Sequence, residues 1–178
     1  GIARDLAAAG IGKLKDLNYK KSKESFKSPI TWKKEFQNNN LCPGVAGRYF
    51  KNVKNVESPK WLQDRLTAIG LRPISALVDI TNYITFDLGR PLHVYDADKV
   101  SGNLTMRLAN KNEECLALNE VNYKCDSDMI VISDDENKLH GIGGVMGGFD
   151  SGCSMETKNV FLEVALFDPV SVTKTGRK

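Results

Sequence analysis

The spacing of the apolar residues changes near residue 93, and this change restricts the possible folds more than any other feature of the sequence. Before it, residues 58–70 and 75–89 carry apolar side chains at three- and four-residue steps, the spacing of amphipathic helices. After it come short apolar runs between polar turns, including LTMRLA, ECLAL, NYKC and MIVIS, which indicate β-strands. Helices grouped in the first half and strands in the second predict an α+β fold rather than alternating βαβ units.

Local signals give the expected ends of the helices. The pair Ser58-Pro59 predicts a helix start with serine as the cap, and a second helix is expected from near Ser75 to Gly89. Helical spacing also occurs over residues 1–9, and Asp168-Pro169 begins a final helical run. The first of these helices lacks a capping residue and the last ends abruptly, so we expect a segment of a longer polypeptide.

A histidine follows the second helix in the string HVYDAD. His93 suits proton transfer or hydrogen bonding near neutral pH, although a lone histidine is more often structural. His93, Asp96 and Asp98 make a poor metal set because no second histidine accompanies them, and we expect no metal site. The two aspartates are better placed to cap a short helix or turn leading to Val100.

Two later segments also carry chemistry. The glycine cluster GIGGVMGG, residues 141–148, fits neither phosphate-loop pattern, so it indicates a tight turn or a close approach of backbone to a ligand. The apolar run VFLEVALF contains one acid, Glu163, on the opposite strand face from Leu162 and Val164. That face is either solvated, or it buries a carboxylate that requires a partner or a function.

The composition is that of an ordinary globular protein able to bury a sizeable core, with 41% hydrophobic and 26% charged residues among 178. Its apolar runs are too short to span a membrane and it has no signal peptide, so we expect a cytoplasmic location. The four cysteines form no C-x-x-C pair and predict reduced, structural thiols. The eight lysines within residues 13–34 suggest either a solvated linker, which we favour, or a nucleic-acid contact.

Together these segments resemble the editing module, termed B3/B4, in the β subunit of bacterial phenylalanyl-tRNA synthetase. The motifs WLQDRLTAIGLRPISALVDITNYI, RPLHVYDADKV, GGVMGG and LEVALFDPVSVTKT stand in the family's order, preceded by the helix-like GIARDLAAAG. The resemblance implies a compact two-lobed module in which helices flank a β-sandwich of unusual topology. We expect an N-terminal helix and variable basic linker over residues 1–45 and the editing module over 46–178, helical to about residue 100 and β-rich thereafter.

In this family the module hydrolyses tyrosine wrongly attached to the phenylalanine tRNA. Its editing histidine follows the asparagine of T-N-Y by eleven positions, as His93 follows Asn82 here, and its glycine and glutamate are nineteen positions apart, as are Gly144 and Glu163. The resemblance implies that Glu163 and Gly144 recognise the tyrosine hydroxyl and that His93 and Asn82 position the ester and the attacking water. Thr81, next to Asn82, completes the expected substrate-binding set.

Physical reasoning supports a dedicated acceptor for the hydroxyl. An apolar slot shaped for phenylalanine excludes tyrosine only about 10²-fold, so a second site must recognise the hydroxyl itself. A charge-assisted hydrogen bond contributes about 1.5–3 kcal/mol, and phenylalanine would leave the acid unpaired. The alternative is that the fold serves as a non-catalytic, tRNA-facing structural module of the synthetase.

The resemblance also implies partners for a whole synthetase. These are the tRNA(Phe) mischarged with tyrosine and the α subunit, in a tetramer of two α and two β chains. No cofactor is expected in this segment, since ATP and magnesium belong to the ligase reaction of the whole enzyme. No membrane partner is expected.

Overall fold

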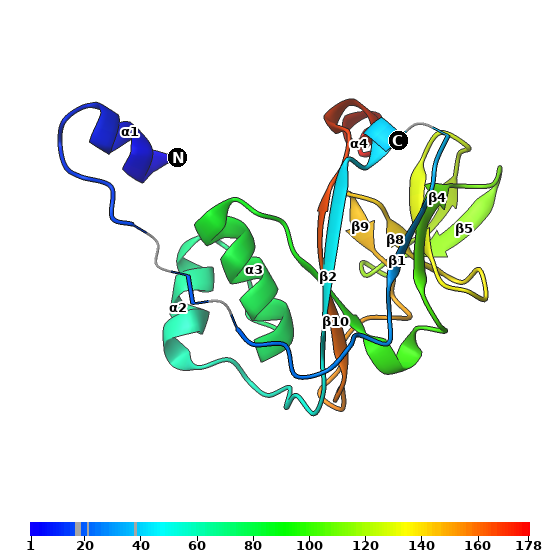
Figure 1. Cartoon of the computed structure of the whole chain (residues 1–178), viewed down its shortest axis with the longest axis horizontal. Helices are drawn as coiled ribbons and strands as arrows, with labels where there is room; N and C mark the ends of the chain where they lie inside the picture. Colours follow the sequence, from blue (N-terminus) through cyan, green and yellow to red (C-terminus); the bar gives the residue numbers. More distant parts are fainter. Residues whose placement is uncertain (17–18, 21, 38) are drawn as a thin grey trace.

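The structure is a computed structural model that describes residues 1–16, 19–20, 22–37 and 39–178 (Figure 1). Its helices match the positions expected from apolar spacing. The α-helices are α1 (Ile2–Ala8), α2 (Lys60–Ala68), α3 (Ala76–Leu88) and α4 (Pro169–Thr175), and the short 3₁₀ helices are η1 (Asn39–Leu41) and η2 (Ala97–Lys99). None of the described helices combines the length and apolarity needed to cross a membrane.

The helices begin and end near the predicted boundaries, but one predicted capping contact is not formed. Gly89 ends α3 in the left-handed conformation, with φ of 62°, and Asp96 caps η2 by accepting from the amide of Asp98. Ser58 does not cap α2 as predicted, because its hydroxyl donates instead to the buried carboxylate of Asp79 at 2.5 Å. The serine therefore joins α2 to α3.

The strands form three sheets. A five-stranded mixed sheet has the order β1-β4-β7-β8-β9, a three-stranded antiparallel sheet has the order β2-β10-β3, and β5 pairs with β6 in a hairpin. The strand bounds are β1 (Trp32–Glu35), β2 (Gly44–Phe50), β3 (His93–Asp96), β4 (Leu104–Leu108), β5 (Glu113–Leu116), β6 (Asn122–Cys125), β7 (Ile130–Ser133), β8 (Leu139–Ile142), β9 (Met146–Gly147) and β10 (Val160–Leu166).

The main core lies between the three-stranded and five-stranded sheets, which makes the β-region a sandwich. Its buried side chains come from strands of both sheets, from η2 and from the segments that precede β1 and β2: Ile30, Cys42, Tyr95, Ala97, Leu104, Met106, Ile132 and Phe161. Gly47 on β2 leaves the space that Phe161 fills, since a Cβ there would lie 2.1 Å from the ring. The four cysteines are free thiols and at least partly buried.

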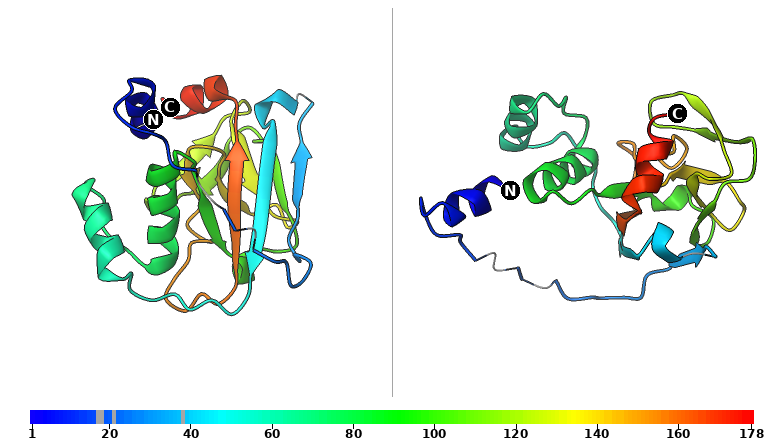
Figure 2. Two further views of the ribbon diagram at one scale, coloured as in Figure 1. Left: turned by 60° about the vertical axis from the view of Figure 1, so that its left-hand side comes forward. Right: turned by 90° about the horizontal axis from the view of Figure 1, so that it is seen from above.

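Figures 1 and 2 show α2 and α3 on one side of the β2–β10 pair and the five-stranded sheet on the other. Helices therefore flank a β-sandwich, and the predicted α+β class is confirmed. The sequence did not predict β1, β2, β3, β8 or β9. Strand β1 and the core residues Ile30 and Cys42 lie within residues 1–45, the range expected to hold a helix and a linker.

Candidate active site

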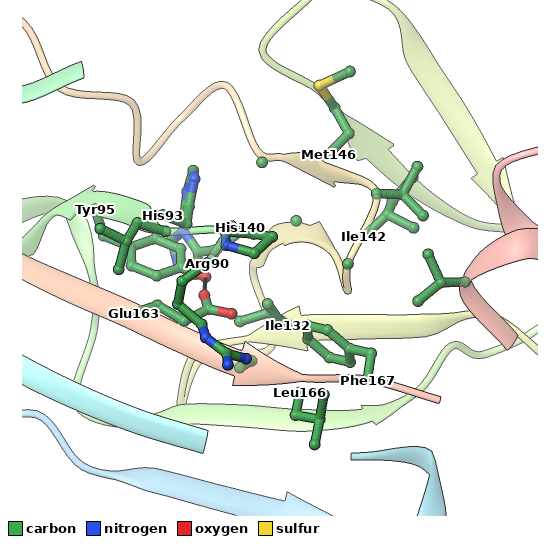
Figure 3. Close-up of a pocket in the computed structure, with 18 of the residues that line it drawn as sticks. Arg90, His93, Tyr95, Ile132, His140, Ile142, Met146, Glu163, Leu166 and Phe167 are labelled. Atoms are coloured by element: carbon green, nitrogen blue, oxygen red, sulfur yellow. Dashed lines mark hydrogen bonds between the residues drawn. The ribbon is translucent and has the colours of Figure 1, made fainter. Parts of the chain in front are cut away.

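A cavity of about 400 Å³ opens between β3, the β8–β9 hairpin, the end of β10 and α4 (Figure 3). One end is polar, with the rings of His93, Tyr95 and His140 gathered beside the carboxylate of Glu163. The remaining wall is mostly apolar and includes Ile132, Ile142, Met146, Leu166, Phe167 and Val172. This size and composition are typical of a site for a small organic group.

Strand pairing brings the polar residues together. Glu163 on β10 lies directly opposite His93 on β3, and Tyr95 lies two residues further along β3. Residues opposite each other in an antiparallel pair, and residues two apart on one strand, point to the same face of the sheet. The apolar run therefore turns its one acid towards the histidine, and the solvated-face interpretation of Glu163 is wrong, because its side chain is 5% exposed.

Glu163 already has one partner inside the protein. The hydroxyl of Tyr95 donates a hydrogen bond to its Oε2, and among the described residues no hydrogen bond engages the other oxygen. Burial raises the pKa of Glu163 from 4.5 to about 7, although the bond from Tyr95 acts in the opposite direction. The carboxyl group therefore changes charge near neutral pH.

His93 is held by packing rather than by hydrogen bonds. Its ring meets that of Tyr95 edge to face with centroids 4.4 Å apart, and its Nε2 is shielded with no partner in the described part of the chain. Burial, and secondarily the charge of His140, lower the pKa of His93 from 6.5 to about 4. The imidazole is therefore neutral at neutral pH.

The second histidine, His140, is oriented by a carboxylate. Its Nε2 lies 3.0 Å from Asp134, whose carboxylate also accepts from three backbone amides at 2.9–3.2 Å. Burial alone would raise the pKa of Asp134, but these hydrogen bonds lower it below its usual range. An ionised carboxylate can only accept, so Nε2 of His140 carries the proton.

The glycine cluster forms the β8–β9 hairpin, so the tight-turn interpretation is confirmed, and close approach of its backbone to a ligand stays a prediction. Gly144 lines the cavity with φ of 73°, and a Cβ there would lie 2.7 Å from the side chain of Val172 on α4. Gly147 lies against His93, since a Cβ there would stand 2.3 Å from the imidazole Cε1. The segment is therefore a tight turn that also brings backbone close to the site.

Two of the five predicted site residues do not line this cavity. His93, Glu163 and Gly144 meet there, whereas Asn82 and Thr81 lie on α3 about two turns before the lining residue Arg90. Thr81 donates from its hydroxyl to the carbonyl of Val78 within its own helix, 2.7 Å away.

Sequence reasoning missed four residues of the site: Tyr95, Asp134, His140 and Gly147. The alternation of His93 and Tyr95 in HVYD was a usable signal for Tyr95, had β3 been recognised as a strand. Asp134, His140 and Gly147 required the pairing of β7, β8 and β9, which no local pattern reveals. Across the described residues, no group of three or more His, Cys, Asp or Glu is arranged to hold a metal ion.

Comparison with known proteins identifies the fold. A family model described as the B3/4 domain matches residues 41–178. The chain belongs to this family. The predicted resemblance to the B3/B4 module of the phenylalanyl-tRNA synthetase β subunit is thereby confirmed.

Curated relatives of this B3/4 domain chain are phenylalanine–tRNA ligase β subunits. Those of Paramagnetospirillum magneticum and Rhodopseudomonas palustris are 53% identical over 180 residues and 54% identical over 178. Each alignment covers 100% of this chain but 22% of the relative, so the chain spans about a fifth of their length. It corresponds to a segment of such a subunit.

A solved structure shares the fold at low sequence identity. It is an N-terminal fragment of the phenylalanyl-tRNA synthetase β subunit from Pyrococcus horikoshii, with a TM-score of 0.60 and 15% identity. The match covers 85% of this chain and 47% of that one. The two proteins thus share the fold over this range.

Proposed function

We propose that this B3/4 domain proofreads aminoacylated tRNA(Phe) by hydrolysing the ester of wrongly attached tyrosine. The observation that supports this most directly is the cavity, which joins mostly apolar walls to a single buried carboxylate, Glu163. The apolar part accommodates an aromatic ring, and the free oxygen of Glu163 accepts the hydrogen bond of a phenol. A pocket of this kind selects tyrosine because phenylalanine lacks the hydroxyl that Glu163 recognises.

The selectivity for tyrosine over phenylalanine is smaller than it would be if Glu163 had no hydrogen-bond donor within the protein. Because Tyr95 already donates to Oε2 of Glu163, phenylalanine in the cavity leaves only the other oxygen without a donor. The difference between the two amino acids is then one hydrogen bond to a charged group, about 1.5–3 kcal/mol or roughly 10- to 150-fold. This range is enough for a second discrimination step after an apolar slot.

Hydrolysis in this proposal needs no protein nucleophile, because the aminoacyl ester is already activated. His93, neutral at physiological pH, lines the cavity and positions the ester or the attacking water, and the terminal hydroxyl of the tRNA can assist. Asn82 and Thr81 remain part of the proposal by resemblance, as residues that meet the substrate beyond the cavity lining. The substrate tRNA and the synthetase α subunit are the proposed partners, and ATP with magnesium is needed only for the ligase reaction of a whole enzyme.

The test is a deacylation assay with Tyr-tRNA(Phe) and Phe-tRNA(Phe), using the chain and a full-length β subunit that contains it. We expect faster release of tyrosine than of phenylalanine, and loss of this preference in Glu163→Ala. Glu156→Ala removes an exposed glutamate outside the cavity and serves as the matched control. Equal hydrolysis of both esters would contradict the proposal, and tRNA binding without hydrolysis would favour a structural module.

A further inference from the structure

Tyr95 is the largest fully buried side chain among the described residues, and it lines the candidate active site. Its ring belongs to the main core, while its hydroxyl reaches Glu163. Burial, followed by the effects of the Glu163 carboxylate, raises the pKa of Tyr95 well above its usual value. The hydroxyl therefore keeps its proton and acts as a donor at every pH at which the protein is used.

The ring of Tyr95 is fixed from several sides. His93 packs edge to face at 4.4 Å, and His140 does so at 6.5 Å with an interplanar angle of 86°. His140 is itself held by Asp134, which is anchored by backbone amides. The Tyr95 side chain is packed so closely that its hydroxyl cannot turn away from Glu163 without displacing the other residues at the polar end of the cavity.

The consequence concerns the two oxygens of Glu163. A carboxylate can accept several hydrogen bonds, and an acid with no fixed donor could turn either oxygen, or neither, towards a ligand. Because Tyr95 engages Oε2, the other oxygen is left for a group that enters the cavity (Figure 3). One phenol from the protein therefore sets the place where a second phenol can bind.

We propose that Tyr95 is a positioning residue that determines the specificity of the site, by holding Glu163 so that its free oxygen accepts the hydroxyl of a bound phenol. This role rests on the proposed function and adds the residue that orients the Glu163 carboxylate. The fixed donor also supports the ionised form, since its hydrogen bond lowers the pKa of Glu163 against the effect of burial. A core tyrosine with a merely structural role would affect tyrosine and phenylalanine alike.

The test compares Tyr95→Phe with the unmutated chain by calorimetric titration of L-tyrosine and L-phenylalanine between pH 5.5 and 9. Tyr123→Phe is the matched control, because it removes a hydroxyl that accepts from Asn119 at 2.9 Å outside the cavity. In Tyr95→Phe we expect the Kd for tyrosine to rise about tenfold at pH 8, as a bond to a charged acceptor becomes a weaker one. The Kd for phenylalanine should change less than threefold.

The pH profile gives a readout that packing alone does not move. Tyrosine affinity in the unmutated chain should rise through the titration of Glu163 near pH 7, and Tyr95→Phe should move this midpoint to higher pH. The other titratable groups around Glu163 are His93, Tyr95 itself, His140 with Asp134 behind it, Cys42 and, in the cavity lining, Arg90. All of these are unchanged in Tyr95→Phe except Tyr95.

A second variant keeps the test decisive if Tyr95→Phe unfolds. Site-specific replacement of Tyr95 by 3-fluorotyrosine retains the ring and strengthens the donor, so it should lower the midpoint and increase the preference for tyrosine. Equal effects on both amino acids, or none, would overturn the role of Tyr95 while leaving the proposed function intact. Equal affinities in the unmutated chain would instead overturn the proposed function, and this role with it.

Discussion

At the scale of single residues, Glu163 combines an ionisable group with almost complete burial. Removing a carboxylate from water disfavours its charged form, which is why its pKa rises to about 7. One donor, Tyr95, offsets part of this cost, and a bound phenol would offset more. The acid is therefore destabilising in the empty site and becomes favourable when a ligand supplies a second donor.

This cost predicts a pH dependence of stability that belongs to Glu163. Because its folded pKa is raised from 4.5 to about 7, the folded state binds more protons than the unfolded state between these values. The free energy of unfolding relative to Glu163→Gln should then fall as pH rises through this window, by up to about 1.4 kcal/mol per pH unit, and level off above it. Urea unfolding at several pH values measures the difference, and a constant difference would contradict it.

His93 gives a second prediction at this scale. Its pKa of about 4 means that it stays neutral from pH 5.5 to 8, so it contributes no activity limb near 6.5. We expect His93→Ala to reduce Tyr-tRNA hydrolysis only a few-fold, with the same ratio to the unmutated chain across that range. A general base contributes about 10²–10⁴-fold, so a loss of that size would assign proton transfer to His93 instead.

At the scale of elements, the β8–β9 hairpin completes the polar end of the cavity that β3 and β10 begin. It presents His140 from one strand and places the backbone of Gly147 against the imidazole of His93. A side chain at 147 would occupy the position of that ring. The glycine is thus required by the histidine that it contacts rather than by the turn itself.

This contact predicts non-additive mutations. Gly147→Ala should displace His93 and reduce deacylation as much as His93→Ala does, whereas the double variant should lose no more than either single one. Gly44→Ala is the matched control, because a Cβ at Gly44 meets nothing within 4 Å. Additive losses in this double-mutant cycle would show that the two positions act separately.

The elements that the sequence predicted are those with local signals. Helix α3 follows from its apolar spacing and from Gly89, η2 from Asp96, and β10 from the apolar run around Glu163. Strands β1 and β2 carry no comparable pattern. They are strands because β4 and β10 supply their partners, which depends on contacts far apart in the sequence.

The residues of the site divide in the same way into those that the sequence could predict and those that it could not. Glu163 could be singled out because one acid in an apolar run is unusual, and His93 and Gly144 by resemblance. Tyr95 and the Asp134–His140 pair could not, because their roles arise only when β3 pairs with β10 and β7 with β8. Asn82 was expected in the site because it belongs to the T-N-Y motif, but it lies on α3 and does not line the cavity.

At the scale of the whole molecule, recognition of the aminoacyl group and capture of the tRNA are separate problems. The described elements bring Glu163, Tyr95 and His93 together without any other chain, so the cavity proposed to bind tyrosine forms within this segment. The tRNA is far larger than this cavity. A net charge of +3 on 178 residues offers little general attraction for its phosphates.

We therefore predict that the chain binds tyrosine as well as a full-length β subunit does, yet hydrolyses Tyr-tRNA(Phe) much more slowly at equal concentration. Relatives carry this segment within a protein of which it is 22%, and the remainder can hold the tRNA so that its 3′ end meets the pocket at a high effective concentration. Single-turnover deacylation at increasing concentrations of the chain measures the difference. The rate should rise in proportion to chain concentration and approach that of the full-length subunit, since the chemistry is the same. A maximal rate that stays far below it would mean instead that residues outside this chain take part in the reaction itself.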